Sequence, residues 1–510
     1  MSVISVPLEP AATEFARLCR TANVVPVHRE ILADLDTPVS AYRKVAAGKP
    51  HSFLLESLEG GEKWARFSFI GTDPRLVFTS RGRSVMVRDR HSVERFEAED
   101  PTESLRAFLA RFRPAEVAGL PRLWAGAVGY ISYDMVRFME RLPDSNPDDL
   151  GCPDCVMVVP ETLLVFDNLR QTARVIRNVF PSEGDDPAAL YAAAHEALDA
   201  TVARLRGPLP HPAAGPPPEV SNRLTSNTTP ERFREMVEAA KRYIREGDAI
   251  QIVLSQRFES RYDGDPFDAY RALRLINPSP YMFYLDFGPQ KLVGSSPEVM
   301  VRLEGEMVEL RPIAGTRRRG RDEQEDLAME RELTTDPKEA AEHIMLVDLG
   351  RNDVGRVSRY GTVEVNELMV VERYSHVMHI VSNVRGQILP GKDAMDVLRA
   401  CFPAGTVSGA PKVRAMEIIE ELEPCRRGVY AGAVGYFNFS GNMDLGITIR
   451  TLMFRNGQVY LQAGAGIVAD SDPEMEYKET INKAKGMMAA LEVAAGLRGN
   501  EVGPLEGSKT

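Results

Sequence analysis

The sequence has no long uninterrupted apolar segment, and this absence narrows the class of protein first. No run approaches the roughly 20 apolar residues that a membrane-spanning helix needs. The first residues, 1–20, include acidic side chains and lack the apolar core of a secretory signal, so we expect no signal peptide. With 44% hydrophobic and 26% charged residues, the composition is typical of a soluble globular protein. We expect a cytoplasmic protein without a membrane partner.

Cysteine is also scarce. The five cysteines are Cys19, Cys152, Cys155, Cys401 and Cys425, a number that fits a reduced compartment better than a disulfide-stabilised secreted protein. Cys152 and Cys155 have the spacing of half a zinc site, but no second pair of cysteines completes four ligands. We therefore interpret this pair as incidental.

Basic residues are outnumbered by acidic ones. The chain has 62 Lys and Arg against 73 Asp and Glu, for a net charge of −11. Because a nucleic-acid-binding surface carries excess positive charge, we expect no nucleic-acid partner and favour small molecules or proteins. The length of 510 residues exceeds the ~250–300 residues that one hydrophobic core usually serves. We therefore predict two domains or two intergrown halves.

The clearest break in the sequence is the proline-rich run Gly207-Pro-Leu-Pro-His-Pro-Ala-Ala-Gly-Pro-Pro-Pro218. Such a run is typical of an exposed, semi-rigid linker. We divide the chain into an N-terminal half of residues 1–206, a linker of residues 207–228 and a second half of residues 229–497. The small and polar residues 498–510 are predicted to form a disordered tail.

Two short strings on one side of this linker recur, in the same order, on the other side. Gly71-Thr-Asp-Pro74 is echoed by Gly294-Ser-Ser-Pro297, and Trp124-Ala-Gly-Ala-Val-Gly-Tyr130 by Tyr430-Ala-Gly-Ala-Val-Gly-Tyr436. Two echoes in one order indicate duplicated β units. Helices occur in both halves without strict alternation with strands. We predict an α+β fold in which duplicated β units form large, mostly antiparallel packed sheets with helices outside.

The stretch from Glu372 to Glu423 combines a predicted strand with a predicted loop and helix. Glu372-Arg-Tyr-Ser-His-Val-Met-His379 lacks a helical apolar stripe, so we predict a strand. His376 and His379 would then point to opposite faces, which excludes a two-histidine metal clip. The loop Gly405-Thr-Val-Ser-Gly-Ala-Pro-Lys412 precedes a helix that Pro424 ends. Its small residues suit either an anion site or a tight turn with nothing bound.

Three carboxylates on two predicted helices are candidate metal ligands. Glu342 lies on the apolar side of a helix that Asp336 and Pro337 begin, and a carboxylate there needs a cation or a donor. Glu476 and Glu479 project from one face of a second helix. The alternative is a solvated face on which Glu479 forms an ordinary ion pair with Lys483. Carboxylates without a cysteine or histidine cluster suit magnesium better than zinc.

Two further features favour a pocket for a small acidic molecule. Gly464-Ala465-Gly466 leaves backbone open to close approach by a ligand. Arg450 ends an alternating segment, where it is either a carboxylate clamp or a surface arginine. The residues alone therefore predict a metal-assisted site for an acidic substrate, with His379 nearby.

Several longer motifs follow one another in the second half. They are Pro312-Ile-Ala-Gly-Thr316, Leu346-Val-Asp-Leu-Gly-Arg-Asn-Asp353, Met378-His379, Gly405-Thr406 with Ser408-Gly-Ala-Pro-Lys412, and Gln462-Ala-Gly-Ala-Gly466. Together they resemble the chorismate-utilising enzymes, and more narrowly the large subunits of anthranilate synthase. The resemblance covers residues 229–497 and continues into the first half at Leu54-Leu-Glu-Ser57 and Gly60-Gly-Glu-Lys-Trp64.

The resemblance implies a Mg²⁺-dependent lyase that converts chorismate and ammonia to anthranilate and pyruvate, the first committed step of tryptophan biosynthesis. It also implies a role for each matching residue. The catalytic set is Glu298 as general acid, His379 in pyruvate loss and Thr406 beside the ring; the substrate-binding set is Gly315, Thr316, Tyr430, Arg450, Gly464, Ala465, Gly466 and Lys483; the metal set is Glu342, Glu479 and, close by, Glu476.

Two positions distinguish the members of this family. Relatives that make isochorismate or salicylate have a lysine where this chain has Gln251, and aminodeoxychorismate synthases have a nucleophilic lysine where it has Ala314. Without an amine at position 314, ammonia itself is the expected nucleophile. The runner-up is aminodeoxychorismate synthase, since some of its members lack the lysine. A chorismate or amino-acid sensor without catalysis is the alternative from another class, and intact Glu298 and His379 argue against it.

The resemblance also implies two partners besides chorismate. Cys401 and Cys425 lack the Gly-rich surroundings of a glutaminase nucleophile, so we expect ammonia from a separate glutamine amidotransferase subunit in a hetero-oligomer. The second partner is L-tryptophan as a feedback inhibitor, bound between the two halves. The residues implied in its pocket are Glu56, Ser57, Lys63, Asn277, Pro278, Pro280, Tyr281 and Met282.

Overall fold

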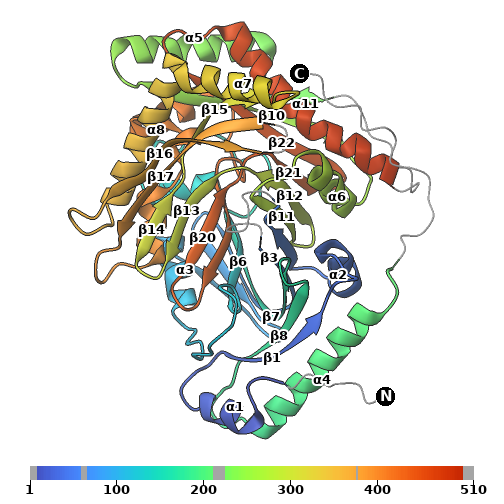
Figure 1. Ribbon diagram of the computed structural model, residues 1–510. Coiled ribbons are helices and arrows are strands. Elements are labelled where there is room, and N and C mark those ends of the chain that lie inside the picture. Colours follow the sequence, from blue (N-terminus) through green and yellow to red (C-terminus); the bar gives the residue numbers. More distant parts are fainter. Residues whose placement is uncertain (1–7, 59–65, 211–223, 375–376, 498–510) are drawn as a thin grey trace.

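The computed structural model describes residues 8–58, 66–210, 224–374 and 377–497 (Figure 1). Within these ranges no helix has both the length and the apolar character to cross a membrane. The strands are β1 (Val25–Leu32), β2 (Ser52–Glu56), β3 (Phe67–Arg81), β4 (Ser84–Arg88), β5 (Val93–Glu97), β6 (Gly126–Ile131), β7 (Cys155–Asp167), β8 (Thr172–Val179), β9 (Thr225–Ser226), β10 (Gln251–Arg261), β11 (Tyr281–Asp286), β12 (Gln290–Ser296), β13 (Val299–Glu304), β14 (Met307–Leu310), β15 (Ile313–Arg318), β16 (Glu364–Arg373), β17 (Val377–Gln387), β18 (Gly409–Ala410), β19 (Ala433–Asn438), β20 (Met443–Ile447), β21 (Thr451–Arg455) and β22 (Gln458–Ile467).

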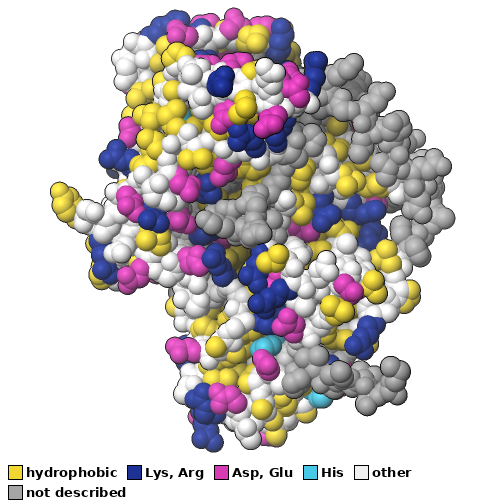
Figure 2. Space-filling view, in the orientation of Figure 1, with side chains coloured by type: hydrophobic (Ala, Val, Ile, Leu, Met, Phe, Trp, Pro, Cys, Tyr) yellow, Lys and Arg dark blue, Asp and Glu magenta, His cyan; other side chains and the backbone are white. Residues whose placement is uncertain are grey.

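The helices are α1 (Ala12–Leu18), α2 (Pro38–Val45), α3 (Pro101–Leu109), α4 (Pro187–Arg206), α5 (Pro230–Glu246), α6 (Pro266–Ile276), α7 (Glu323–Thr335), α8 (Pro337–Gly355), α9 (Ala394–Cys401), α10 (Lys412–Leu422) and α11 (Pro473–Leu497), with 3₁₀ turns η1 (Tyr133–Phe138) and η2 (Gly405–Val407). In Figure 1, α5, α7, α8 and α11 lie over one end of the strands, and α1 and α4 lie at the other end. The helices are therefore outside the sheets, as predicted. Lys and Arg side chains are interspersed with Asp and Glu over the face that Figure 2 shows.

The strands form one hydrogen-bonded network that divides at β7. One edge of β7 pairs with β3, and the other edge pairs first with β6 and then with β8. The first arm runs β8, β7, β3, β2, β11, β12, β21, β22, β10, and the second runs β7, β6, β19, β20, β13, β14, β17, β16. All pairings between the named strands are antiparallel, as predicted. Each arm contains strands from both sides of the proline-rich run.

Each pair of repeated strings brings strands from the two halves of the sequence together within one arm. The Ala-Gly-Ala-Val-Gly-Tyr echoes form β6 and β19, which pair with each other so that Gly129 faces Gly435. The other echo lies in two hairpins, β2–β3 and β11–β12, which join through β2 and β11. Gly71 pairs with Phe53 in the first hairpin as Gly294 pairs with Phe283 in the second, and any side chain at either glycine would collide with that ring. The duplicated β units are confirmed.

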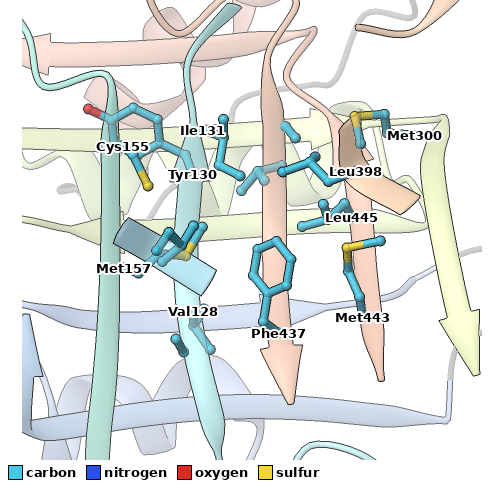
Figure 3. Packing of buried hydrophobic residues seen from close by; sticks show 14 of the residues in the cluster. Val128, Tyr130, Ile131, Cys155, Met157, Met300, Leu398, Phe437, Met443 and Leu445 are labelled. Carbon is cyan, nitrogen blue, oxygen red and sulfur yellow. The ribbon is translucent and has the colours of Figure 1, made fainter. Parts of the chain in front are cut away.

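The largest hydrophobic core lies between the arms and draws on both halves of the chain. Val128 of β6 and Met157 of β7 are buried in one cluster with Phe437 of β19 and Leu445 of β20 (Figure 3). Residues 1–206 and 229–497 are therefore intergrown. The predicted linker begins after α4 and ends before α5; its residues 211–223, like the predicted tail 498–510, lie outside the described residues.

The prediction of one strand from Glu372 to His379 is wrong. Strand β16 ends at Arg373 and β17 begins at Val377, and the two pair as a hairpin in which Glu372 faces His379. The backbone N–H of Tyr374 closes the turn on the carbonyl of Val377, 2.8 Å away. Apolar and β-branched residues continue on both sides without a Gly, Pro, Asn or Asp between them, so the sequence carries only the weak turn signal of Ser375. His376 lies outside the described residues.

Candidate active site

Glu298 occupies the link between β12 and β13, at the bottom of the site. Its backbone carbonyl accepts from the N–H of Ile447 at 3.0 Å, and only 7% of the residue is exposed. Burial raises the pKa of the carboxyl to about 8, against the lowering effects of the Thr406 hydroxyl, the Ile313 N–H and the Arg450 charge. A buried carboxyl with this pKa holds its proton at neutral pH. Glu298 is therefore equipped to donate a proton.

Thr406 lies in η2, which α8 contacts closely. Any side chain at Gly405 would collide with Leu349 of α8. The Thr406 hydroxyl is close enough to lower the pKa of Glu298, yet among the described residues it has no partner at hydrogen-bond distance. A buried hydroxyl without a partner is costly unless a ligand satisfies it. The position of Thr406 thus suits contact with a bound molecule.

His379 is buried on β17, with its ring held by β15. Its Nδ1 lies 2.9 Å from the carbonyl oxygen of Gly315 and 3.1 Å from Oγ1 of Thr316. Because a carbonyl can only accept, Nδ1 carries the hydrogen and Nε2 is the nitrogen that can exchange a proton. Gly315 forms a bulge in β15 with φ of +64°, a conformation that favours glycine. Gly315 and Thr316, predicted to bind substrate, here orient the histidine.

The Gly464-Ala465-Gly466 segment belongs to β22, beside β10. Gly464 pairs with Ser255 and Gly466 with Val253. An added Cβ at Gly464 would lie 2.6 Å from the hydroxyl of Tyr430, so that hydroxyl borders the segment. Lys483 of α11, which was also predicted to bind substrate, donates from Nζ to the carbonyl of Gly464 at 3.0 Å.

Arg450 is exposed, in the turn between β20 and β21, with φ of +48°. It is thus a surface arginine and not a buried one. Its positive charge nevertheless lowers the pKa of Glu298, which means that the guanidinium lies at the same site. An arginine at the rim of a site can be exposed to solvent and still take part in that site.

The three predicted metal ligands influence one another electrostatically. Burial raises the pKa values of Glu342 and Glu476, and repulsion from Glu479 adds to both. Glu342 accepts from Nε2 of Gln251 at 3.3 Å, while Glu479 pairs with Lys483 at 2.7 Å, the ion pair that the sequence left as an alternative. Glu342 and Glu476 are partly buried and Glu479 is exposed, and such mutually repelling carboxylates match the oxygen donors that a hard cation prefers. Within the described ranges no three acidic, histidine or cysteine side chains form a closed metal cluster.

A cavity of about 360 Å³ lies between the two arms and contains five of the eight residues predicted to bind tryptophan: Glu56, Ser57, Pro280, Tyr281 and Met282. The pairing of β2 with β11, which sets Met282 opposite Glu56, brings the two segments together. Asn277 and Pro278 precede this lining, and Asn277 ends α6. Lys63 lies outside the described residues.

The carboxylate of Glu56 is engaged by α6. It accepts from the hydroxyl of Tyr270 at 2.5 Å and from Nε of Arg274 at 3.0 Å. An ammonium group of a ligand in the cavity would therefore compete with an arginine for this carboxylate. The sequence did not indicate this, because the face on which a strand residue lies depends on the register and on the helix packed behind it.

A buried ion pair that sequence reasoning missed joins the parts of the site. Arg427 donates to both carboxylate oxygens of Glu423, at 2.7 and 2.9 Å, and to the carbonyls of Val407 and Val253, each at 2.7 Å. Its guanidinium also lies 5.5 Å from the centre of the Tyr430 ring. The pair thus fixes η2 against β10. The Glu-Pro-Cys-Arg-Arg string was its only sequence signal.

Comparison with known proteins agrees with this geometry. Residues 51–489 match the model of the chorismate binding enzyme family, and the chain belongs to that family. It is 49% identical to anthranilate synthase component 1 of Aquifex aeolicus over 483 residues, which are 94% of this chain and 97% of the relative. Component 1 of Pseudomonas aeruginosa is also 49% identical, over 94% of this chain and 98% of its own. The chain is accordingly an enzyme, a lyase of the anthranilate synthase type.

Solved structures show the same fold. Anthranilate synthase component I of Streptococcus pneumoniae superimposes with a TM-score of 0.75 and 39% identity, covering 90% of this chain and 99% of the other. The menaquinone-specific isochorismate synthase of Escherichia coli gives a TM-score of 0.68 at 20% identity, over 94% of this chain and 99% of the other. The second similarity concerns the fold alone. The predicted fold class is confirmed.

Proposed function

We propose that the chain converts chorismate and ammonia to anthranilate, pyruvate and water in a Mg²⁺-dependent reaction that begins the synthesis of tryptophan. The observation that carries the proposal is the buried carboxyl of Glu298, which holds its proton at neutral pH and lies beside the hydroxyl of Thr406. Loss of a hydroxyl from chorismate needs a proton donor, because hydroxide is a poor leaving group. A carboxyl with a pKa of about 8 supplies that proton near neutral pH.

The reaction then divides between Glu298 and His379. Ammonia forms a bond to C2 of the ring as the C4 hydroxyl departs, and the proton from Glu298 converts that hydroxyl to water. The ring next loses the C2 proton, and the C3–oxygen bond breaks to release pyruvate and leave aromatic anthranilate. The hydrogen bond from Nδ1 of His379 to Gly315 leaves Nε2 to take part in this proton transfer.

Magnesium and the carboxylates of chorismate account for the remaining residues. When bound, Mg²⁺ would orient the ring carboxylate and offset its charge. Glu342 and Glu479 would hold the ion, with Glu476 close by; the raised pKa values of Glu342 and Glu476, to which repulsion from Glu479 contributes, favour a bound cation. For the enolpyruvyl carboxylate we propose Tyr430, Arg450, Lys483 and the backbone of Gly464, Ala465 and Gly466. The hydroxyl of Tyr430 and Nζ of Lys483 border that backbone.

We further propose that ammonia comes from a separate glutamine amidotransferase subunit in the cytoplasm. Cys401 and Cys425 are buried, and burial raises the pKa of each thiol. Burial likewise raises the pKa values of Cys152 and Cys155. A glutaminase nucleophile must be an accessible thiolate, which these four are not. The names of the relatives, each a component 1, support a second component.

The cavity between the arms is proposed to bind L-tryptophan as a feedback inhibitor. Its volume of about 360 Å³ falls within the range of small-molecule sites. Aromatic and aliphatic side chains, among them Phe69, Met282 and Tyr436, supply an apolar surface suited to an indole, and Ser57 lies at its edge. Replacement of Ser57 by alanine is expected to weaken tryptophan binding.

One assay tests the catalytic proposal. Purified chain is incubated with chorismate, Mg²⁺ and ammonium salt at pH 8, and anthranilate is followed by its fluorescence. Steady anthranilate formation that stops when Mg²⁺ is chelated supports the proposal. An aminated product that remains non-aromatic would instead identify an aminodeoxychorismate synthase, and binding of chorismate without turnover would identify a sensor.

A further inference from the structure

One wall of the cavity between the arms is also the support of His379. Three side chains on this wall form a connected chain. Arg311 donates to Glu372 at 2.5 Å, and the hydroxyl of Tyr374 donates to the other oxygen of Glu372 at 2.8 Å. All three line the cavity. A molecule bound in the cavity therefore meets a set of side chains that are held together.

The same hairpin carries His379 at its catalytic face. Glu372 is the direct cross-strand neighbour of His379, and the ring of Tyr374 lies 5.5 Å from the imidazole at an angle of 65°. Edge-to-face contacts of this kind are favourable. Tyr374 is thus a side chain that lines the cavity and also touches the histidine, while Thr316 and Gly315 hold the other side of that ring.

A second contact between cavity and site lies at Glu298, and it differs in kind. Pro297 and Val299 line the cavity, whereas the carboxyl of Glu298 between them faces Thr406. This connection runs through backbone within the sheet, which is stiff. At the end of the hairpin, in contrast, the connection is made by a side-chain ring and not by strand backbone.

We propose that Tyr374 is the positioning residue through which occupation of the cavity controls His379. This inference rests on the proposed function, namely that His379 acts in pyruvate loss and that the cavity binds L-tryptophan. A bound indole ring displaces or fixes the Tyr374 ring, and the imidazole, which is packed against it, shifts relative to the substrate. Because coupling between two binding sites is reciprocal, bound chorismate then weakens tryptophan binding by the same factor by which tryptophan weakens chorismate binding.

The test measures this factor directly. L-Tryptophan is titrated calorimetrically into the full chain with and without saturating chorismate, in the absence of ammonia and glutamine. We expect chorismate to weaken tryptophan binding to the wild type about ten-fold, within the usual range of allosteric coupling. In Tyr374→Ala the tryptophan Kd without chorismate stays within about three-fold of wild type, and the coupling factor falls below about two.

Two further variants separate transmission from simple loss of shape. Tyr374→Phe keeps the ring against His379 and should retain the wild-type coupling factor. Tyr374→Leu keeps bulk without the ring, so its coupling factor should fall as in Tyr374→Ala. The leucine variant also replaces the alanine variant if the latter does not fold. Tyr436→Phe is the matched control, because Tyr436 lines the same cavity and packs on Phe69. It should keep the factor.

Each result has a distinct meaning. Full coupling in both Tyr374→Ala and Tyr374→Leu would overturn the role of Tyr374, and so would loss of tryptophan binding in those variants, since the ring would then be a ligand contact only. If wild-type chain does not bind tryptophan, the proposed regulatory site itself is wrong, and this inference is withdrawn with it.

Discussion

Single residues decide the chemistry of this site, and Glu298 is the clearest case. Its carboxyl is buried with a pKa of about 8, well above the ordinary value of 4.5. The folded protein therefore binds this proton more tightly than the unfolded chain does. The resulting stabilisation is complete below the unfolded pKa and is lost as pH rises through about 8.

Replacing Glu298 by glutamine should separate catalysis from stability. A neutral amide cannot donate the required proton, so we expect anthranilate formation with ammonia to fall at least about 100-fold. The melting temperature should match wild type near pH 5 and exceed it near pH 9, where wild type must bury a charge. Melting curves at the two pH values provide the measurement. Equal pH dependence of both proteins would contradict the raised pKa.

The metal proposal makes a prediction about charge at Glu342 and Glu479. Glu342→Gln and Glu479→Gln keep the shape and lose the charge that a hard cation needs. Each should raise the Mg²⁺ concentration for half-maximal activity about ten-fold or more, without changing the melting temperature of the metal-free chain by more than a few degrees. Glu474→Gln is the control, because Glu474 lies on the same helix but pairs with Arg234 at 2.8 Å. Unchanged Mg²⁺ titrations in both variants would remove these residues from the metal site.

For His379 the expected effect is on one step only. His379→Ala should impair pyruvate loss more than amination, because Nε2 is proposed to act in the second step. An aminated, non-aromatic intermediate should then accumulate and be visible by chromatography, with anthranilate formation reduced about 100-fold. If chorismate consumption and anthranilate formation fall together and no intermediate appears, the assignment is wrong.

Among the elements, η2 depends on a side chain outside it. Arg427 bonds the backbone of η2 at Val407 and the backbone of β10 at Val253, and it neutralises Glu423. Removal of the arginine would leave Glu423 charged and buried, and Ser255 would be its one remaining donor among the residues that the structure describes.

Arg427→Gln should therefore destabilise the chain by about 3–5 kcal/mol, the usual cost of breaking a buried pair. The control is Arg351→Gln, which breaks an exposed pair with Asp348 at 2.9 Å and should cost less than about 1 kcal/mol. Denaturant unfolding of the two variants gives the comparison. A small and equal effect in both would mean that the buried pair does not hold η2.

Some of the helices and strands could be predicted from the sequence, while other features could not. The helix carrying Glu342 was predicted because the cap at Asp336 is a local signal. The helix carrying Glu476 was predicted from the spacing of Glu476 and Glu479, and the structure shows that Asp472 accepts from its first turn as well. The antiparallel sheets were predictable because the echoed strings fixed equivalent strands. The turn at Tyr374 was missed because Ser375 is the only turn-favouring residue in the sequence there, and serine is a weak signal. The engagement of Glu56 by α6 and the Glu423–Arg427 pair were missed because each depends on contacts between distant segments.

The chain has a synthase site, and four of its five cysteines are buried, namely Cys152, Cys155, Cys401 and Cys425. The isolated chain should thus make anthranilate from chorismate with ammonium salt at a steady rate. With glutamine alone the rate should be at least about 100-fold lower, because four of the five cysteines are buried and burial also raises the pKa of the half-buried Cys19, so that none is suited to release ammonia as a thiolate. The comparison uses equal chain concentrations and anthranilate fluorescence. Comparable rates with glutamine, without a second polypeptide, would contradict the need for a partner subunit.

The interleaving of β2 with β11 and of β6 with β19 has a consequence for synthesis on the ribosome. When residues 1–206 have emerged, β2 and β6 each have one unpaired edge. The partner of β2 is β11, about 225 residues later in the sequence, and the partner of β6 is β19, about 300 residues later. Long-range strand pairing of this kind is slow, and unpaired edges promote aggregation while it proceeds. Two strand edges in the first half of the chain therefore stay unpaired until the second half has been synthesised and pairs with them. Whether the first half aggregates during this interval depends on how fast translation finishes and on what covers those edges until then.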